Sequence, residues 1–281
     1  MSRQQQSQLV HLVRLLDDTD ARMQHIIRKE LIKNSLEIVL QKHYLLGHIP
    51  ANALENVQQL LGTLHNELVE HAFYQVVQQP GDDVDLEKAM AVLSYWNDPF
   101  FDYRELKEAL DRMAGEIGTF LPSSGHPLVF LDHLNFILFS RHKFRGNRAD
   151  YYNPDNIYLD RVLKSKKGIP ISLSIVYLLL AHRLNLPIYG VSMPSHFLLK
   201  FYNGEDEIFF DAFNEGKIYS RNECLRFLEN AHHAEPETVL NGCDNREIVA
   251  RVLRNLKVIY AFYKPDDGKL QFVEHLLSFF A

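Results

Sequence analysis

Apolar residues recur every three or four positions through residues 1–120, and this spacing predicts helices. Segments such as MQHIIRKELIKNSLEIVL and LENVQQLLGTLHNELVEHAF carry it, and breakers such as GHIP (47–50) and QPGDD (79–83) separate them. The cluster PSSGHP (122–127) is the strongest internal boundary signal. We therefore expect a helical N-terminal region that ends near residue 120.

The pattern becomes mixed after this boundary. It predicts helices at 128–144, 154–167 and 170–184, and a strand at 186–193. Asn153 followed by Pro154 suits an N-cap and the first helical position, where the missing N–H of proline costs nothing. Gly168 stands where the helix at 154–167 should end, and Pro170 opens the next helix almost at once.

A hairpin is expected around Asn203-Gly204, because Asn-Gly stands there between the apolar runs HFLLKFY and EIFFDAF. Ser220 and Glu223 then have the spacing of a capping box and open another helix, and further helical patterns come after it. Helices, a short antiparallel sheet and helices again indicate an α+β fold. The predicted ranges are 1–120 for the helical N-terminal region, 121–235 for the core and 236–281 for a helical tail.

The hairpin brings a histidine and an aspartate together. A two-residue turn would place His196 directly opposite Asp211, and a four-residue loop would place them diagonally on the same face. An odd-length loop would separate them. On one face, Asp211 can accept a hydrogen bond from the imidazole and fix its tautomer, as in hydrolase sites. The same pair can also simply satisfy itself as part of the structure.

The helix that begins at Pro170 is the candidate third part of such a site. A helix N-terminus carries partial positive charge and free N–H groups, so a cysteine there would be an activated nucleophile. The stretch GIPISLS has no cysteine. Ser172 and Ser174 lie in the first turns, but a serine needs a closely placed base. Serines at such positions commonly bond to the backbone instead.

These motifs, in this order, resemble a known family. FRGNRADYYNPDNIYLDRVLKSKKGIPISLSIVYLLLAHRLNLPIYGVSMPSHFLLKF and then FFDAFNEGKIYSRNEC closely resemble the SirB-type transglutaminase-like family. This mainly bacterial group often has a tetratricopeptide-like helical tail, and its domain also occurs in a eukaryotic F-box protein. The resemblance covers about residues 95–235.

The resemblance implies a papain-like core that holds a Cys–His–Asp triad. His196 and Asp211 match the histidine and the aspartate of the triad. Pro170 matches the position of the nucleophile, and a shift of one or two residues in the alignment would reach Ser172. The cysteine is therefore missing, as this branch of the family tends to have it missing. The chain also has Pro-Ser before His196 where the family usually has Pro-Gly.

The loop FRGNRADYYNPDN is a candidate binding rim, because loops on rigid scaffolds often carry recognition. Its polar and aromatic groups can equally cap the loop itself. The candidate binding residues in and beside it are Arg145, Asn147, Tyr152, Asn153 and Asn156.

Composition limits which partners, cofactors and cellular location we expect. The chain of 281 residues is 46% hydrophobic, and its net charge of −6 gives no support for a nucleic-acid partner. The apolar run at 175–181 is far shorter than the roughly 20 residues of a membrane helix, and we see no signal peptide. Cys224 and Cys243 form no C-x-x-C, so we expect cytoplasmic residence. Adjacent His232 and His233 would point about 100° apart on a helix, and we expect neither a metal nor a cofactor.

Two functions from different classes remain. The leading hypothesis is a non-catalytic protein that binds a protein or peptide with its remnant cleft. The alternative is a hydrolase or acyl-transfer enzyme, in which Ser172 is the nucleophile, His196 the base and Asp211 the orienting group. A purely structural His–Asp pair is the third reading.

Overall fold

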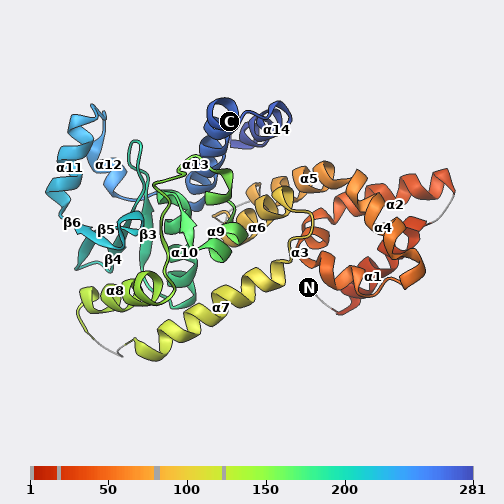
Figure 1. Cartoon of the computed structure of the whole chain (residues 1–281), viewed down its shortest axis with the longest axis horizontal. Helices are drawn as coiled ribbons and strands as arrows, with labels where there is room; N and C mark the ends of the chain where they lie inside the picture. Colours follow the sequence, from red (N-terminus) through yellow and green to blue (C-terminus); the bar gives the residue numbers. More distant parts are fainter. Residues whose placement is uncertain (1–2, 18–19, 79–82, 122–124, 281) are drawn as a thin grey trace. The chain divides into compact units, whose positions relative to one another are not determined.

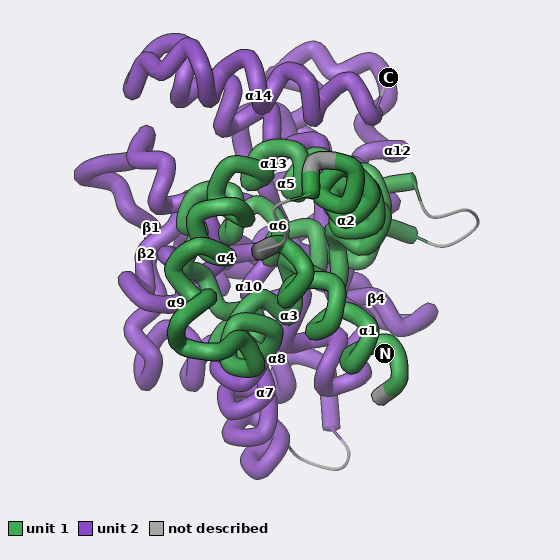
Figure 2. Tube along the Cα trace, turned by 90° about the vertical axis from the view of Figure 1, so that its right-hand side faces the viewer, with its two compact units in different colours: residues 1–106 green, residues 107–281 purple. Residues whose placement is uncertain are grey.

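The computed structural model describes residues 3–17, 20–78, 83–121 and 125–280. The chain divides into two compact units, residues 1–106 and 107–281 (Figure 2). This division falls inside helix α7 (Tyr103–Phe120) and not at the predicted boundary near residue 121. Residues 122–124 of the predicted boundary cluster and residues 79–82 of the predicted breaker lie outside the described residues.

Unit 1 is helical, as the three- and four-residue spacing predicts. Its helices are α1 (Arg3–Arg14), α2 (Ala21–Lys33), α3 (Ser35–Leu46), α4 (Ala51–Thr63), α5 (His65–Val77) and α6 (Leu86–Asn97), with a 3-10 turn η1 (Leu15–Asp17). Helices α3, α5 and α6 pack against one another. Every residue of α6 from Ala89 to Trp96 is buried, so this helix is enclosed on all sides.

Unit 2 carries a four-stranded antiparallel sheet among helices (Figure 1), which confirms the α+β class. The sheet consists of β3 (Ile188–Val191), β4 (Leu198–Tyr202), β5 (Glu207–Asp211) and β6 (Lys217–Tyr219), in that order. The helical elements before it are α7, α8 (Pro127–Asn135), η2 (Phe136–Arg141), η3 (Pro154–Asn156), α9 (Leu159–Ser165) and α10 (Pro170–Arg183). Those after β5 are η4 (Ala212–Asn214), α11 (Arg221–Asn230), α12 (Pro236–Leu240), α13 (Asn245–Val258), η5 (Ile259–Tyr263), α14 (Asp267–Leu277) and η6 (Ser278–Phe280).

The two faces of the sheet meet different helices because side chains alternate along a strand. Phe210 of β5 packs on Tyr177 of α10, with ring centroids 5.0 Å apart. Its neighbour Phe209 belongs to a second buried cluster that includes Cys224 and Leu228 of α11. Strand β5 therefore lies between α10 and α11.

The hairpin between β4 and β5 has a four-residue turn. Tyr202 pairs with Glu207, and Leu199 with Phe210, so the two-residue turn and its register are wrong and the four-residue alternative holds. Asn203 explains the longer turn, because its side-chain oxygen accepts hydrogen bonds from the N–H groups of Glu205 and Asp206. The even shift keeps the same face, as the alternative requires.

The segment before α10 also differs from its prediction. The predicted helix at 154–167 is the short turn η3 and then α9, and Lys166, in the left-handed conformation with φ 60°, ends α9 before Gly168. Gly168 instead lies in β2 (Lys167–Gly168), which pairs in parallel with β1 (Arg145–Gly146). A Cβ on Gly168 would lie 2.6 Å from Ser172 Oγ, so the close approach of this strand to α10 requires glycine.

The predicted starts of helices α10 and α11 are confirmed. Helix α10 begins at Pro170. Ser220 N–H donates to Glu223 Oε2 at 2.8 Å and Glu223 N–H donates to Ser220 Oγ at 3.3 Å, which is the expected capping box at α11. Among the described residues, the structure has no helix whose length and apolar character would let it cross a membrane.

Candidate functional site

Asp211 is a buried polar residue of unit 2 that is held by four hydrogen bonds. It is the last residue of β5, and its side chain is completely buried. Its Oδ1 accepts hydrogen bonds from the N–H groups of Phe213 (2.9 Å) and Asn214 (3.3 Å). Its Oδ2 accepts from Asn214 Nδ2 (2.5 Å) and bonds to His196 Nε2 (2.8 Å). The carboxylate thus caps η4 and fixes the histidine with the same two oxygens.

The environment keeps Asp211 ionised. Burial alone would raise the pKa of this carboxyl, but its hydrogen bond to His196, the charge of that ring, and the bonds from Asn214 and Phe213 outweigh burial and lower the pKa. An ionised carboxylate can only accept hydrogen bonds, so His196 Nε2 must be the donor. In the neutral ring, Nδ1 then remains as an acceptor, which can take a proton or bind a donor group.

His196 lies in a loop of residues 192–197 between β3 and β4, which we call the histidine loop. Its ring retains 27% of its side-chain exposure. Ser195, just before it, has φ 55°, in the left-handed region that favours glycine. The SirB-type family that the sequence resembles usually has glycine at this position, so here a residue less suited to a left-handed φ makes the turn.

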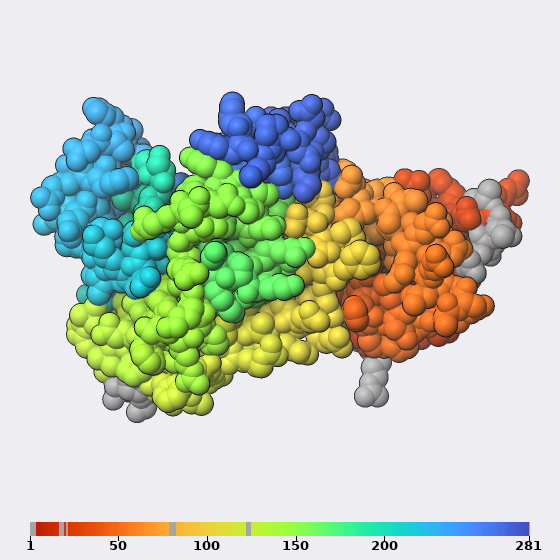
Figure 3. Space-filling model, viewed as in Figure 1, coloured from red at the N-terminus to blue at the C-terminus, as the bar shows by residue number. Residues whose placement is uncertain are grey.

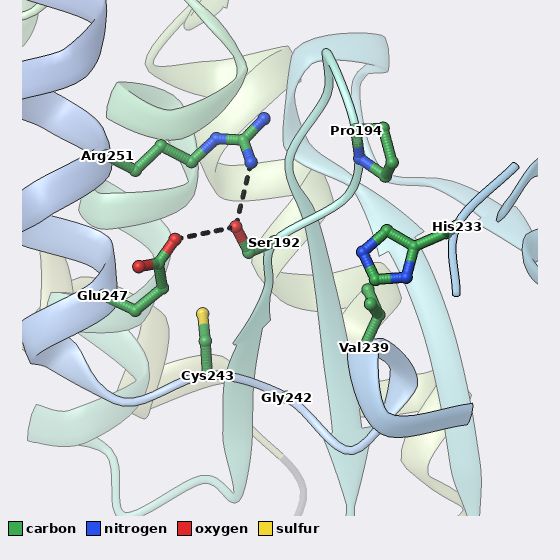
Figure 4. Close-up of a pocket in the computed structure, with 8 residues that line it drawn as sticks. All are labelled: Ser192, Pro194, His233, Val239, Gly242, Cys243, Glu247 and Arg251. Atoms are coloured by element: carbon green, nitrogen blue, oxygen red, sulfur yellow. Dashed lines mark hydrogen bonds between the residues drawn. The ribbon is translucent and has the colours of Figure 1, made fainter. Parts of the chain in front are cut away.

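The far side of the histidine loop is held by Arg251 of α13. Its Nη2 donates to two main-chain oxygens, Met193 O at 2.7 Å and His196 O at 2.8 Å. Its Nη1 donates to Ser192 Oγ at 2.9 Å, and Ser192 Oγ in turn donates to Glu247 at 3.3 Å (Figure 4). One guanidinium therefore ties three residues of the loop to α13.

The start of α10 uses Ser172 as a cap. Its Oγ is buried, accepts a hydrogen bond from Ile169 N–H at 3.0 Å and donates to Asn156 O at 2.5 Å. Within the described residues, no hydrogen bond joins Ser172 to His196. The hydroxyl that the enzyme hypothesis requires as nucleophile is engaged with the backbone, and Pro170 at the first helical position offers neither a nucleophile nor an N–H.

The candidate rim separates into two groups. Asn147, Asn153 and Asn156 serve the loop itself: Asn147 Nδ2 donates to Asn156 Oδ1 at 2.9 Å, and Asn153 Oδ1 accepts from Asp155 N–H at 2.9 Å. Asn156 is buried and donates to two main-chain oxygens of the loop, at 2.6 and 3.0 Å. These three asparagines therefore have their amide groups engaged inside the loop.

The remaining rim candidates face solvent. Arg145 is exposed in β1, and Tyr152 is exposed and stacked on Tyr263 of η5. Arg148, their neighbour, lies over the Phe213 ring at 4.8 Å and donates to Asn214 Oδ1. The rim therefore meets the His–Asp pair through Asn214.

Two pockets flank the histidine loop. The first, of about 180 Å³, adjoins the His196 ring; its lining comes from the loop, β4, β6 and α11, namely Met193, His196, Leu198, Tyr219, Glu223, Cys224 and Phe227. The second, of about 450 Å³, lies on the α13 side of the loop (Figure 4). Its lining includes Pro194, His233, Cys243 and the Ser192–Glu247–Arg251 network.

Neither cysteine replaces the missing nucleophile. Burial, followed by the nearby glutamates, raises the pKa of Cys224 to about 11. Burial, followed by Glu247 and Asp244, raises the pKa of Cys243 to about 12. Both thiols are therefore protonated near neutral pH and poorly nucleophilic. Across the described residues, no group of three His, Cys, Asp or Glu side chains has an arrangement that could hold a metal ion.

Sequence reasoning missed Asn214 and Arg251. Asn214 comes three residues after Asp211, a spacing typical of a carboxylate that caps the next turn, so a local signal was present. Arg251 had no such signal, because it reaches the loop from more than 50 residues away along the chain.

The sequence model of the transglutaminase-like superfamily matches residues 104–254, which contain the His–Asp pair, the start of α10 and Arg251. The chain belongs to the transglutaminase-like superfamily. No solved structure shows significant similarity to it.

Several curated proteins are similar to part of this chain. F-box only protein 21 of Mus musculus is 39% identical over 135 residues, which are 45% of this chain and 21% of that protein. A UPF0162 protein of Xylella fastidiosa (strain Temecula1) is 36% identical over 152 residues, 52% of this chain and 54% of that protein. The UPF0162 protein YchA of Escherichia coli (strain K12) is 28% identical over 181 residues, 63% and 65% of the two chains. The chain thus spans about a fifth of the F-box relative and about half of the Xylella relative.

Asp211 predicts a pH-dependent contribution to stability. The folded pKa of Asp211 lies below its unfolded value of about 3.9, so the ionised carboxylate stabilises the fold above that pH. This contribution is lost as the pH falls through the folded pKa. We expect Asp211→Asn to lower the free energy of unfolding by about 2 kcal/mol near neutral pH and by less below about pH 4, measured by urea unfolding.

The matched control is Glu205→Gln, at an exposed glutamate in the hairpin turn, which should change the free energy of unfolding by less than about 0.5 kcal/mol. An Asp211→Asn deficit of equal size at both pH values would contradict the assignment.

Ser195 predicts a stabilising substitution. Because its left-handed φ costs a non-glycine residue about 1–2 kcal/mol, Ser195→Gly should raise the free energy of unfolding by about 1 kcal/mol, after the extra entropy of glycine in the unfolded chain. Ser165→Gly, at the end of α9, should instead lower it by about 1 kcal/mol. If both variants lose stability in urea unfolding, the conformation assigned to Ser195 is wrong.

Proposed function

We propose that this chain is a non-catalytic, SirB-type member of the transglutaminase-like superfamily that binds a segment of a partner protein at the cleft beside His196. The observation that carries the proposal is that the Ser172 hydroxyl is engaged in hydrogen bonds to the backbone. The helix start that should present a nucleophile has Pro170 at the first helical position, and the nearest hydroxyl is buried between Ile169 N–H and Asn156 O.

The other two residues expected in a triad site, His196 and Asp211, are present and bonded to each other. Both carboxylate oxygens of Asp211 accept hydrogen bonds, and His196 lines a pocket whose other lining residues are mainly apolar. A small, mainly apolar pocket whose lining also includes a few polar side chains is suited to hold a side chain and fix its backbone. Phe227, which lines the pocket, is 46% exposed and so offers an apolar contact to an incoming chain.

The acyl-transfer alternative makes a distinct prediction. If Ser172 were a nucleophile, a fluorophosphonate probe would label the protein, and Ser172→Ala and His196→Ala would each abolish labelling. We expect no labelling, because the Ser172 proton is donated to a backbone oxygen. We expect Ser172→Ala instead to lower the free energy of unfolding by about 1–2 kcal/mol through loss of the cap. An active serine hydrolase is the positive control, and labelling that depends on both residues would overturn the non-catalytic assignment.

The binding role is tested by selection from a displayed random peptide library on the immobilised full chain. A selected peptide, labelled with fluorescein, should bind His196→Ala and Phe227→Ala at least about tenfold more weakly than the wild type in fluorescence polarisation, because a contact in the pocket is removed. Phe100→Ala removes another exposed phenylalanine, in unit 1, and should leave the affinity within about twofold. Failure to select any peptide, or peptides indifferent to both cleft variants, would contradict the proposal.

A further inference from the structure

We propose that the partner segment is acidic, and that its carboxylates bind a cationic patch on unit 2 next to the His196 cleft. This inference rests on the proposed peptide-binding function. We define the patch as the Lys and Arg residues that lie in the β1–β2 ladder or within about three residues of it along the chain, namely Lys143, Arg145, Arg148, Lys164, Lys166 and Lys167.

The charge of this region opposes that of the whole chain. Residues 141–170 contain eight Lys and Arg against three Asp and no Glu, whereas the rest of the chain has 22 Lys and Arg against 33 Asp and Glu. The segment lies on the surface of unit 2 that Figure 3 shows in yellow-green to green. A local cationic surface in an acidic protein attracts acidic partners and steers them to this place.

The patch is not neutralised within the protein. No salt bridge joins any of its six side chains to a carboxylate of the described residues, although many cations elsewhere in the chain are paired, such as Arg221 with Glu207 and Arg254 with Glu247. Unpaired like charges in proximity repel one another, so this arrangement costs free energy that an acidic ligand would recover.

The fold holds the charges close together. The parallel pairing of β1 and β2 makes Arg145 the direct neighbour of Lys167. The left-handed turn at Lys166 sends its side chain over the Phe144 ring at 4.6 Å. Burial lowers the pKa of Lys166, and no acidic group opposes that shift. A carboxylate placed there would stabilise the half-buried ammonium group.

Arg148 joins the patch to the cleft. Its guanidinium lies over Phe213 and donates to Asn214, whose amide donates to Asp211 beside His196. Planar guanidinium groups bind carboxylates with two parallel hydrogen bonds, and Arg148 is exposed at the surface. A peptide that places a side chain in the cleft could therefore set a neighbouring carboxylate on Arg148.

A peptide fits this surface better than a nucleic acid does. Nucleic-acid binding requires a dense and extended cationic footprint, whereas here six cations form an isolated group in a chain with an excess of acidic residues. A short acidic peptide needs only a few cations, and it would avoid the acidic surface elsewhere.

The test uses the peptides selected on the full chain. Their sequences should be enriched in Asp and Glu over the unselected library. Arg145→Glu with Lys167→Glu should weaken a selected peptide at least about tenfold, and Arg145→Gln with Lys167→Gln should have an intermediate effect. Arg22→Glu with Lys29→Glu gives the same change of net charge at exposed positions in α2 and should alter the affinity less than about twofold. Circular dichroism of each variant checks that the fold is kept.

The possible results separate the two proposals. Selected peptides that depend on Phe227, but show no acidic enrichment and no response to the patch variants, would overturn the acidic-partner inference and leave the cleft function standing. Failure to select any peptide would overturn both. Polyuridylate RNA is tested as a competitor of the peptide. If the RNA displaces the peptide and binds the patch variant more weakly than the wild type, the patch is assigned to a nucleic acid instead of an acidic peptide.

Discussion

The structure around the candidate site depends on one buried carboxylate. A charge that is fully removed from water is stable only when hydrogen bonds replace its hydration, and Asp211 is surrounded by four such bonds. Meeting that requirement fixes the turn after β5, the amide of Asn214 and the ring of His196. The geometry that makes a histidine useful in a catalytic triad is therefore also the geometry that lets this strand end inside the protein.

The other polar groups of the site are held in the same way, by hydrogen bonds that the fold itself requires. Ser172 closes the first turn of α10 onto the loop that carries Asn156, and Gly168 allows β2 to approach it. Arg251 ties the histidine loop to α13 by satisfying two main-chain oxygens. Each polar group of the frame thus has a structural partner of its own. None of these bonds involves a nucleophile at the start of α10, so the shape of the site does not depend on one.

Features set by local rules could be predicted from the sequence, whereas features set by distant contacts could not. The start of α10, the α11 capping box and the same-face relation of His196 and Asp211 come from caps, periodicity and even loop length. The predicted turn length was wrong because Asn-Gly suits a two-residue turn, whereas here the Asn203 side chain accepts hydrogen bonds from the N–H groups of Glu205 and Asp206 and so favours a four-residue turn. The predicted end of α9 at Gly168 was wrong because Lys166 adopts a left-handed φ, which is usually found in glycine. Arg251 could not be found, since nothing near it in the sequence marks the loop that it holds.

The candidate rim contains two kinds of polar side chain: those whose hydrogen bonds are already made inside the loop, and those that remain open to a ligand. A polar side chain that completes the folding of its own loop has few groups left for a ligand, and the asparagines at 147, 153 and 156 are of this kind. The cations around β1 and β2 are of the other kind, because no carboxylate of the described residues neutralises them. Residue type alone does not separate these classes, since amides and guanidinium groups both suit recognition. What separates them is whether the fold has already used their hydrogen bonds and charge, and by that measure the cations, the histidine and the apolar pocket are the parts of this surface that remain available to a partner.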